Sequence, residues 1–418
     1  MSSSRRSLLA RFGPGILVAA TGIGAGDLIT ASLAGSEVGL VVVWACVLGA
    51  LLKWSINEGI ARWQLATGST LIEGWSQRFG PWFTWLFLGY FLIWSFAVCG
   101  ALASACGIAA DGFLRIGGDA TTSRILWGSA HSIVGALLVW KGGFKRFERA
   151  MTALTAIMVV SVFASAALIV IAMPGDSLAT IIPSELPRGR EQWIWILGVL
   201  GGIGGTVTML SYGYWIREAG WRGAEGLRTS RLDLVVSYTL AALFGSAMVI
   251  IGSRITGTGK GAAVALQLAD QLASALGPFA KWTFLAGFWA AVATSLLGVW
   301  QGAPYLFADI LRVRAAKGHA PDHRHEHVAA LRRSPQYRWF LLAIATIPLV
   351  LLWVSVKEVQ LVYATLGAAF MPVTALTLLI LNNRGAWVGT YRNGMVANAL
   401  LVATLALFTY LAIAGISD

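Results

Sequence analysis

Long windows without a charged residue decide what this chain can fold into. Nine are present, and two further windows hold one charge each, Asp27 in residues 12–36 and Lys53 in residues 38–57. The nine are residues 82–110, 125–140, 150–175, 192–216, 234–253, 282–308, 339–356, 359–383 and 393–417. A helix needs about 20 apolar residues to cross a membrane. We therefore predict an all-α polytopic membrane protein with about eleven transmembrane helices, of which 125–140 is the shortest.

Composition excludes several other classes of protein. Only 12% of the residues are charged, against about 25% in soluble domains. The net charge of +12 does not indicate nucleic-acid binding, because the basic residues lie in short loops between apolar windows. Cys46, Cys99 and Cys106 lie inside such windows and are interpreted as small core residues. The sequence contains no P-loop, HExxH motif or nucleophile elbow, so we expect neither an enzyme nor a bound cofactor.

The distribution of Lys and Arg predicts the orientation. With the N-terminus inside, 22 of the 31 basic residues lie in inside loops and 8 outside, and Lys53 lies within a span. Cytoplasmic loops carry the excess of positive charge. We therefore expect a multi-pass protein of a bacterial-type plasma membrane, with a cytoplasmic N-terminus and an external C-terminus. The segment 262–277 has helical apolar spacing and is predicted to be a short helix on the outer surface.

Two of the windows carry matching glycine clusters. Residues 21–27 read TGIGAGD and residues 201–208 read GGIGGTVT. Each glycine destabilises a helix interior by about 1 kcal/mol, and a matched pair of interrupted spans is typical of secondary transporters with inverted repeats. We predict repeats at about 12–175 and 192–383, broken first and sixth helices, and an additional helix at 393–417. Close helix packing is the alternative explanation of these glycines.

Asp27 is the sharpest candidate for a site residue. A charge in mid-span costs at least about 2.5 kcal/mol and by default indicates a function. A carboxylate beside the free carbonyls of a broken helix makes an oxygen-rich cation site, although an aspartate here would also cap the second half-helix. The sixth span adds a hydroxyl and a thioether after its glycines. The candidate substrate-binding residues are Gly24, Ala25, Asp27, Gly205, Thr208, Met209 and Ser211, and the candidate metal ligands are Asp27, Thr208 and Met209.

Other polar residues are given structural interpretations. Glu37, Lys53 and Glu58 are expected to pair with one another rather than to form a proton relay. Four of the five histidines lie in one predicted cytosolic loop, as His319, His323, His325 and His327. We interpret that loop as polar and flexible, with a weak Zn²⁺ or Ni²⁺ site as the alternative.

Several short motifs occur in a fixed order along the chain. They are Phe12-Gly13-Pro14-Gly15, Gly35-Ser36-Glu37-Val38-Gly39, Ala61-Arg62, Thr67-Gly68 with Leu71 and Glu73, and Gly204-Gly205-Thr206-Val207. Together they resemble motifs of the NRAMP family of proton-coupled divalent metal transporters. The resemblance extends over nearly the whole chain in span count and topology. It implies the leucine-transporter fold, in which two inverted repeats of five helices hold the substrate at broken helices 1 and 6.

The substrate motifs depart from that family. Its first-span Asp-Pro-Gly-Asn falls on residues 24–27, so that Gly24 replaces the first metal-binding aspartate and Asp27 replaces the asparagine. Its sixth-span Met-Pro-His-Asn falls on residues 208–211, so that Thr208 replaces the metal-selecting methionine, or Met209 takes its place if the break is one residue longer. Leu210 and Trp215 replace the family's histidines. The resemblance thus implies an altered site, suited to a harder ion such as Mg²⁺ or Mn²⁺, with proton or sodium coupling left open.

An organic solute is the competing cargo. The glycine-rich first span is also similar to the break in amino-acid transporters of the same architecture, where half-helix amides receive a carboxylate. Tyr212, Tyr214 and Trp215 would then line a solute pocket beside Asp27. A receptor or membrane enzyme has no motif in its favour.

Overall fold

The fold is described by a computed structural model over residues 13–172, 181, 190–254, 263–315 and 326–416. Within these ranges the chain is all helical, without a strand. The helices of the first half are α1 (Gly13–Gly22), α2 (Ala25–Val38), η2 (Leu40–Val42), α3 (Val43–Thr67), α4 (Leu71–Phe79), α5 (Pro81–Phe113) and α6 (Ala120–Ala172). Those of the second half are α7 (Arg190–Gly202), η4 (Val207–Leu210), α8 (Ser211–Ala219), α9 (Gly223–Gly252), α10 (Ala263–Leu276), α11 (Pro278–Ala315), α12 (Glu326–Arg333), α13 (Pro335–Thr346), η5 (Ile347–Trp353), α14 (Val356–Asn383), α15 (Gly385–Val388), η6 (Gly389–Tyr391) and α16 (Met395–Ile416).

The described residues of each predicted window are mainly helical. Among the described residues, eight helical stretches are long and apolar enough to cross a membrane, and Gly13–Gly22, Leu28–Val38 and Met395–Leu411 are shorter apolar helices. The windows 125–140 and 150–175 share α6, which changes direction at Gly143, where φ is 68°. The predicted surface helix is α10. The many-spanned, all-α architecture predicted from the windows is therefore confirmed.

Local sequence signals set the helix boundaries that matter for the site. The Thr70 hydroxyl accepts a hydrogen bond from the Glu73 amide, and the Glu73 side chain accepts one from the Thr70 amide, which satisfies two amides that a helix start leaves free. Pro81 starts α5 directly after Gly80, whose φ is 90°. The short α4 between them thus holds Glu73 at a fixed place at one end of the bundle.

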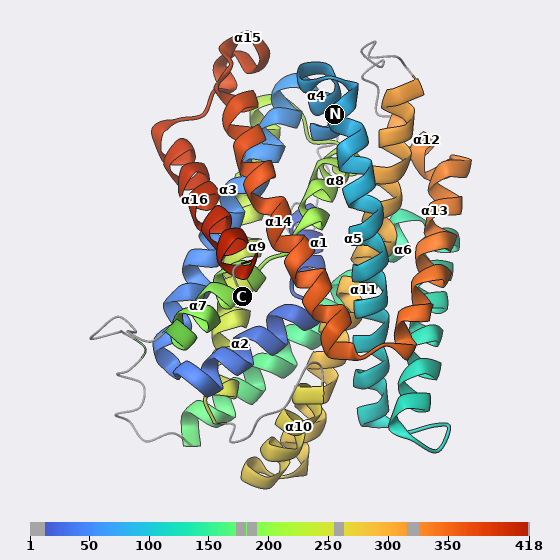
Figure 1. Cartoon of the computed structure of the whole chain (residues 1–418), viewed down its shortest axis with the longest axis vertical. Coiled ribbons are helices and arrows are strands. Elements are labelled where there is room, and N and C mark those ends of the chain that lie inside the picture. Colours follow the sequence, from blue (N-terminus) through green and yellow to red (C-terminus); the bar gives the residue numbers. More distant parts are fainter. Residues whose placement is uncertain (1–12, 173–180, 182–189, 255–262, 316–325, 417–418) are drawn as a thin grey trace, which may run out of the picture.

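Helix α11 lies in the middle of the packing. It contacts α5, α6, α10 and α1, and almost all of its side chains between residues 284 and 310 are buried. Figure 1 shows α4, α12 and α15 at one end of the molecule and α10 at the other. Arg78 on α4 and Arg332 and Arg333 on α12, all predicted to lie inside, are at this end. Cys46, Cys99 and Cys106 are buried, as expected of core residues.

Cysteine labelling tests the predicted orientation. We expect an impermeant maleimide added outside intact cells to label Thr121→Cys but not Gln336→Cys, because both positions are exposed and the loops that hold them are predicted to lie on opposite sides. The parent chain is the control, because its three cysteines are buried and should not react with the maleimide. Labelling of Gln336→Cys alone would reverse the predicted topology.

Candidate functional site

Two interrupted helices meet in the centre of the protein. Helix α1 ends at Gly22 and α2 begins at Ala25. Helix α7 ends at Gly202, and η4 begins only at Val207. Gly204 and Gly205, in the second gap, have φ values of 91° and 84°, a backbone conformation that side chains other than glycine's rarely adopt. The predicted breaks in the first and sixth spans are thus confirmed.

The backbones of the two breaks touch each other. A Cβ atom on Gly22 would lie 2.6 Å from the carbonyl carbon of Gly204 and 2.9 Å from the amide nitrogen of Gly205. Contact this close requires glycine. The two interpretations of the glycine clusters therefore hold together, because the same residues interrupt the helices and permit close packing.

Polar atoms surround this junction. The Ser295 hydroxyl, on α11, lies 3.1 Å from the carbonyl oxygens of both Thr21 and Ile23 and donates to them. The hydroxyls of Thr21, Thr206 and Ser211 are buried and have no hydrogen-bond partner in the described part of the chain. Buried polar groups normally have partners, and one without is a place where a water, an ion or a ligand is missing. Three such hydroxyls on α1, α8 and the second gap mark the junction as a candidate ligand site.

A buried lysine occupies one side of the junction. The Lys53 ammonium donates to the carbonyl oxygen of Gly201 at 2.7 Å and to that of Gly202 at 3.3 Å, and the residue is fully buried. These carbonyls belong to the C-terminal end of α7, where the helix dipole is negative and favours a cation. One of the two negative helix ends at the junction therefore already holds a positive charge of the protein.

The expected pairing of Lys53 with Glu58 and Glu37 is wrong. Glu58 instead binds Arg62, with 2.6 Å between Oε1 and Nη2, and Arg231, with 2.8 Å between Oε1 and Nε. Residues 53 and 58 are five apart in α3, which turns their side chains about 140° from each other, whereas the spacing of four places Arg62 next to Glu58. Glu37 is exposed.

The predicted site residues fall at or beside the junction. Gly24 lies in the first gap and Gly205 in the second. Thr208 and Met209 are in η4 and Ser211 starts α8, all three buried. The Tyr238 hydroxyl donates to the Met209 sulfur at 3.5 Å. Ala25 and Asp27 are in the first turn of α2, but their side chains lie outside the described residues.

Side chains of the usual metal-binding kinds do not gather in the described part of the chain. No group of three His, Cys, Asp or Glu residues is placed there to hold a metal ion. His319, His323 and His325, and the side chain of His327, lie outside the described residues. His131 is satisfied by neighbours, because its Nε2 accepts from Trp289 at 2.8 Å and its Nδ1 lies 2.7 Å from the Trp127 carbonyl oxygen. A cation at the junction would therefore depend on carbonyls, hydroxyls and Asp27.

The three aromatic residues expected to line a solute pocket serve other contacts. The Tyr212 hydroxyl donates to Asp233 at 3.0 Å, the Tyr214 hydroxyl to Asp309 at 2.6 Å, and the Trp215 indole to Gln301 at 2.7 Å. All three are at most 1% exposed. Each ring is thus held by α9 or α11, and this part of the prediction is wrong.

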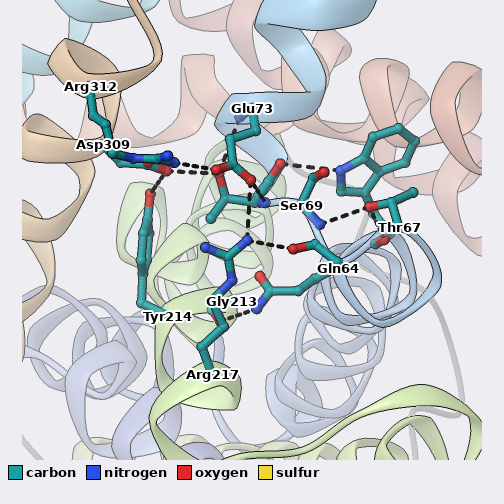
Figure 2. A network of polar contacts seen from close by, with 12 residues as sticks. Gln64, Thr67, Ser69, Glu73, Gly213, Tyr214, Arg217, Asp309 and Arg312 are labelled. Carbon is teal, nitrogen blue, oxygen red and sulfur yellow. Dashed lines mark hydrogen bonds and ion pairs between the residues drawn. The ribbon is translucent and has the colours of Figure 1, made fainter. Parts of the chain in front are cut away.

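A network of charges lies between α4, α8 and α11 at one end of the bundle (Figure 2). Glu73 on α4 binds Arg217 on α8, with 3.1 Å between Oε2 and Nη2, and Arg312 on α11. Arg312 also binds Asp309, with 2.6 Å between Nη2 and Oδ1. The two carboxylates are 2% and 0% exposed. Three helices that are distant in sequence are therefore tied together by four ionised groups.

Hydroxyls and amides extend this network. Asp309 accepts hydrogen bonds from Tyr214 at 2.6 Å and from Thr70 at 2.7 Å. The Gln64 side chain donates to the Gly213 carbonyl oxygen, and Arg217 donates to that of Gly68. The contacts fix α8, the half-helix that follows the second break, to α3, α4 and α11. We call this set of contacts around Glu73 and Asp309 the α4–α8–α11 network.

Sequence analysis missed this network. Arg217 and Arg312 were counted only as markers of the inner loops, and Asp309 was not singled out. Glu73 was noted as part of a family motif, and the capping pattern Thr70-Leu71-Ile72-Glu73 was the one available signal that it has a fixed position.

Known proteins are similar to this chain over nearly its whole length. The profile of the family described as natural resistance-associated macrophage protein-like (Nramp) matches residues 15–418. The divalent metal cation transporter MntH 1 of Pseudomonas aeruginosa is 27% identical over 300 residues, which are 69% of this chain and 66% of that protein. The divalent metal cation transporter MntH of Brucella suis biovar 1 is 24% identical over 264 residues, 60% of this chain and 55% of that protein. The matched part thus spans less than two thirds of each relative.

Solved structures share the fold. The manganese transporter of Eremococcus coleocola, in complex with an aromatic bis-isothiourea substituted compound, superposes with a TM-score of 0.73 at 18% identity, over 100% of this chain and 88% of that chain. MhsT in complex with L-phenylalanine gives a TM-score of 0.57 at 14% identity, over 97% and 99% of the two chains. The leucine-transporter type of architecture with broken helices is thereby confirmed.

Proposed function

The chain belongs to the natural resistance-associated macrophage protein-like (Nramp) family, and from that membership we propose that it is a secondary active transporter of a divalent metal cation. The two MntH relatives are named divalent metal cation transporters, and members of the family are transporters rather than enzymes. The observation that carries the proposal is the junction of two interrupted helices, since broken helices at the membrane midplane are where such transporters bind their cargo.

The proposed cation site takes its donor atoms from both breaks of the junction. Asp27 supplies the full negative charge, and the unpartnered hydroxyls of Thr21, Thr206 and Ser211 supply neutral oxygen atoms. Thr208 and Met209 come from η4. Oxygen ligands and waters suit the Mn²⁺ and Mg²⁺ class of ions. With one carboxylate among neutral donors, the cation keeps part of its hydration shell.

Lys53 opposes cargo binding in this proposal. Its ammonium holds the Gly201 and Gly202 carbonyl oxygens, which are the acceptors at the end of α7 that a cation would otherwise use. A divalent ion at the junction is repelled by this fixed charge. The affinity for cargo is therefore lower than the donor oxygens alone would give.

Opposite effects of two substitutions test the site. Purified protein is titrated with Mn²⁺ and Mg²⁺, and radiotracer uptake into proteoliposomes is measured with a proton gradient or a sodium gradient. We expect Asp27→Asn to lower uptake about tenfold or more, since it removes the full charge, and Lys53→Met to raise the apparent affinity for the cation, since it removes the opposing charge.

Unchanged cation binding in both variants would show that the cation does not bind at the junction. Asp270→Asn is the matched control, because that carboxylate is exposed and lies on α10. Uptake of amino acids into the same proteoliposomes is measured in parallel. Uptake of an amino acid with no uptake of either cation would replace the proposed cargo, although the use of Tyr212, Tyr214 and Trp215 in other contacts does not favour that outcome.

A further inference from the structure

A basic hollow lies between the kink of α6 and the α12–α13 corner. Its volume is about 240 Å³, far above the roughly 15 Å³ that one water molecule needs. The basic residues that line it are Lys141, Arg332, Arg333 and Arg338. No acidic residue is among the lining residues described. Four positive charges around one hollow repel each other, and a bound anion would offset this repulsion.

Among the described residues, no carboxylate forms an ion pair with the basic residues that line this hollow. Glu218 accepts a hydrogen bond from the Tyr305 hydroxyl at 2.8 Å. Glu148, further along α6, faces α1, because its Oε1 would lie 2.6 Å from a Cβ on Gly13. The Nη1 atom of Arg332 is fully buried and has no hydrogen-bond partner among the described residues. A guanidinium nitrogen left in this state points to a ligand that accepts hydrogen bonds.

The hollow lies where an apolar surface changes into a basic one. Along α6, Val134 and Leu137 are 62% and 50% exposed, as expected of side chains that face lipid, and Trp140 beside Lys141 is 42% exposed. On α13, Trp339 follows the lining residue Arg338 and is 71% exposed. Tryptophan is enriched at the height of the lipid headgroups. Figure 1 places α12 and α13 together along one side of the bundle, and α13 packs against α6.

The break in α6 makes room for the ligand. Gly143 has a φ of 68°, and a Cβ on it would meet nothing within 4 Å. Gly143 is one of the residues that line the hollow, so this part of its wall carries no side chain. The hollow and its positive charge are thus formed by two segments, the kink of α6 and the α12–α13 corner.

We propose that this basic hollow binds the phosphate group of an anionic membrane phospholipid. Arginines bind phosphate oxygens with charge-assisted hydrogen bonds, and basic pockets between helices at the cytoplasmic boundary are suited to anionic headgroups. The acyl chains lie along the exposed apolar side chains of α6 and α13. The site is independent of the proposed cargo, and it lies on the side that the Lys and Arg distribution assigns to the cytoplasm.

Thermal stability of the purified full chain in detergent tests the proposal. We expect phosphatidylglycerol to raise the apparent melting temperature, while phosphatidylcholine and inorganic phosphate at equal concentration do not. Arg332→Gln/Arg338→Gln should weaken the apparent affinity for phosphatidylglycerol about 25-fold, at about fivefold for each basic residue. The matched control is Lys145→Gln/Arg146→Gln, which removes two exposed charges of α6 outside the hollow and should bind like the parent.

The remaining outcomes decide against the proposal. An equal loss in the control variant would mean that the net charge of this face, not the hollow, attracts the lipid. Equal stabilisation by inorganic phosphate would assign the hollow to a free anion. If the double variant does not fold, Arg333→Gln, at an exposed position of the hollow, replaces it, and unchanged affinity in that variant would overturn the proposal.

Discussion

Gly22→Ala is expected to reduce transport about a hundredfold. The new Cβ would lie 2.6 Å from the backbone of Gly204, and backbone cannot move aside as a flexible side chain can. The two interrupted helices must then separate, which shifts the carbonyls of both breaks, and a displacement of about 1 Å in a binding geometry can cost about a hundredfold in rate. Overpacking of this kind also costs about 1–3 kcal/mol of stability. Uptake per folded protein in proteoliposomes measures the effect.

Gly201→Ala is the matched control for this change. Gly201 is also a helical glycine at the junction, but its nearest neighbour would be a Phe408 ring atom at 3.7 Å, an ordinary contact. Its carbonyl bond to Lys53 does not depend on its side chain. Parent-like uptake in Gly201→Ala together with parent-like uptake in Gly22→Ala would show that the close approach of the backbones is not needed for transport.

Arg312→Gln is expected to lower the free energy of unfolding by about 3–5 kcal/mol. Arg312 binds both Glu73 and Asp309, which are 2% and 0% exposed. Its loss leaves Asp309 without its ion pair and Glu73 with Arg217 alone, and removing one partner of a buried ion pair is strongly destabilising. The apparent melting temperature of the purified protein at a fixed heating rate measures the loss, because membrane proteins of this size often unfold irreversibly.

Lys281→Gln provides the comparison. Lys281 also binds an aspartate, Asp270, at 2.6 Å, but the two side chains are 32% and 66% exposed, and exposed pairs contribute little. We expect no measurable change in that variant. Arg312→Lys should restore only part of the stability, because an ammonium cannot bridge two carboxylates as a guanidinium fork does. Equal melting temperatures for the parent and Arg312→Gln would mean that the α4–α8–α11 network contributes nothing to stability.

The membrane architecture could be predicted because it follows from the length of the charge-free windows, which can be measured along the sequence. Charge-free windows are read along the chain, and the described residues of each one are mainly helical. The breaks at Gly24 and Gly204 were also predictable, since clustered glycine is a local signal. That the two breaks touch was not, because the contact between Gly22 and Gly204 joins segments about 180 residues apart.

The polar contacts were predicted less well for a physical reason. Lys53 and Glu58 were paired by their nearness in sequence, although helical geometry turns them apart and a backbone end on α7 offers the lysine better acceptors. Glu73, Arg217 and Arg312 are charges near span ends, and such charges usually mark topology. Which of them meet inside the protein depends on how α4, α8 and α11 pack, and that is not encoded in any short stretch of sequence. The roles of Asp27 and of the repeat boundaries at 12–175 and 192–383 stay predictions.

Helix α11 contacts both the first break and the α4–α8–α11 network. On α11, Ser295 holds the carbonyl oxygens of the first break, and Asp309 and Arg312 belong to the α4–α8–α11 network. Fourteen residues separate Ser295 from Asp309, about 21 Å along the helix. Pro304 lies between them, and a proline inside a helix is a usual place for a bend. A bend of α11 at Pro304 would uncouple its two arms: the arm that carries Asp309 and Arg312 could then tilt as the network opens, while Ser295 keeps its place at the first break.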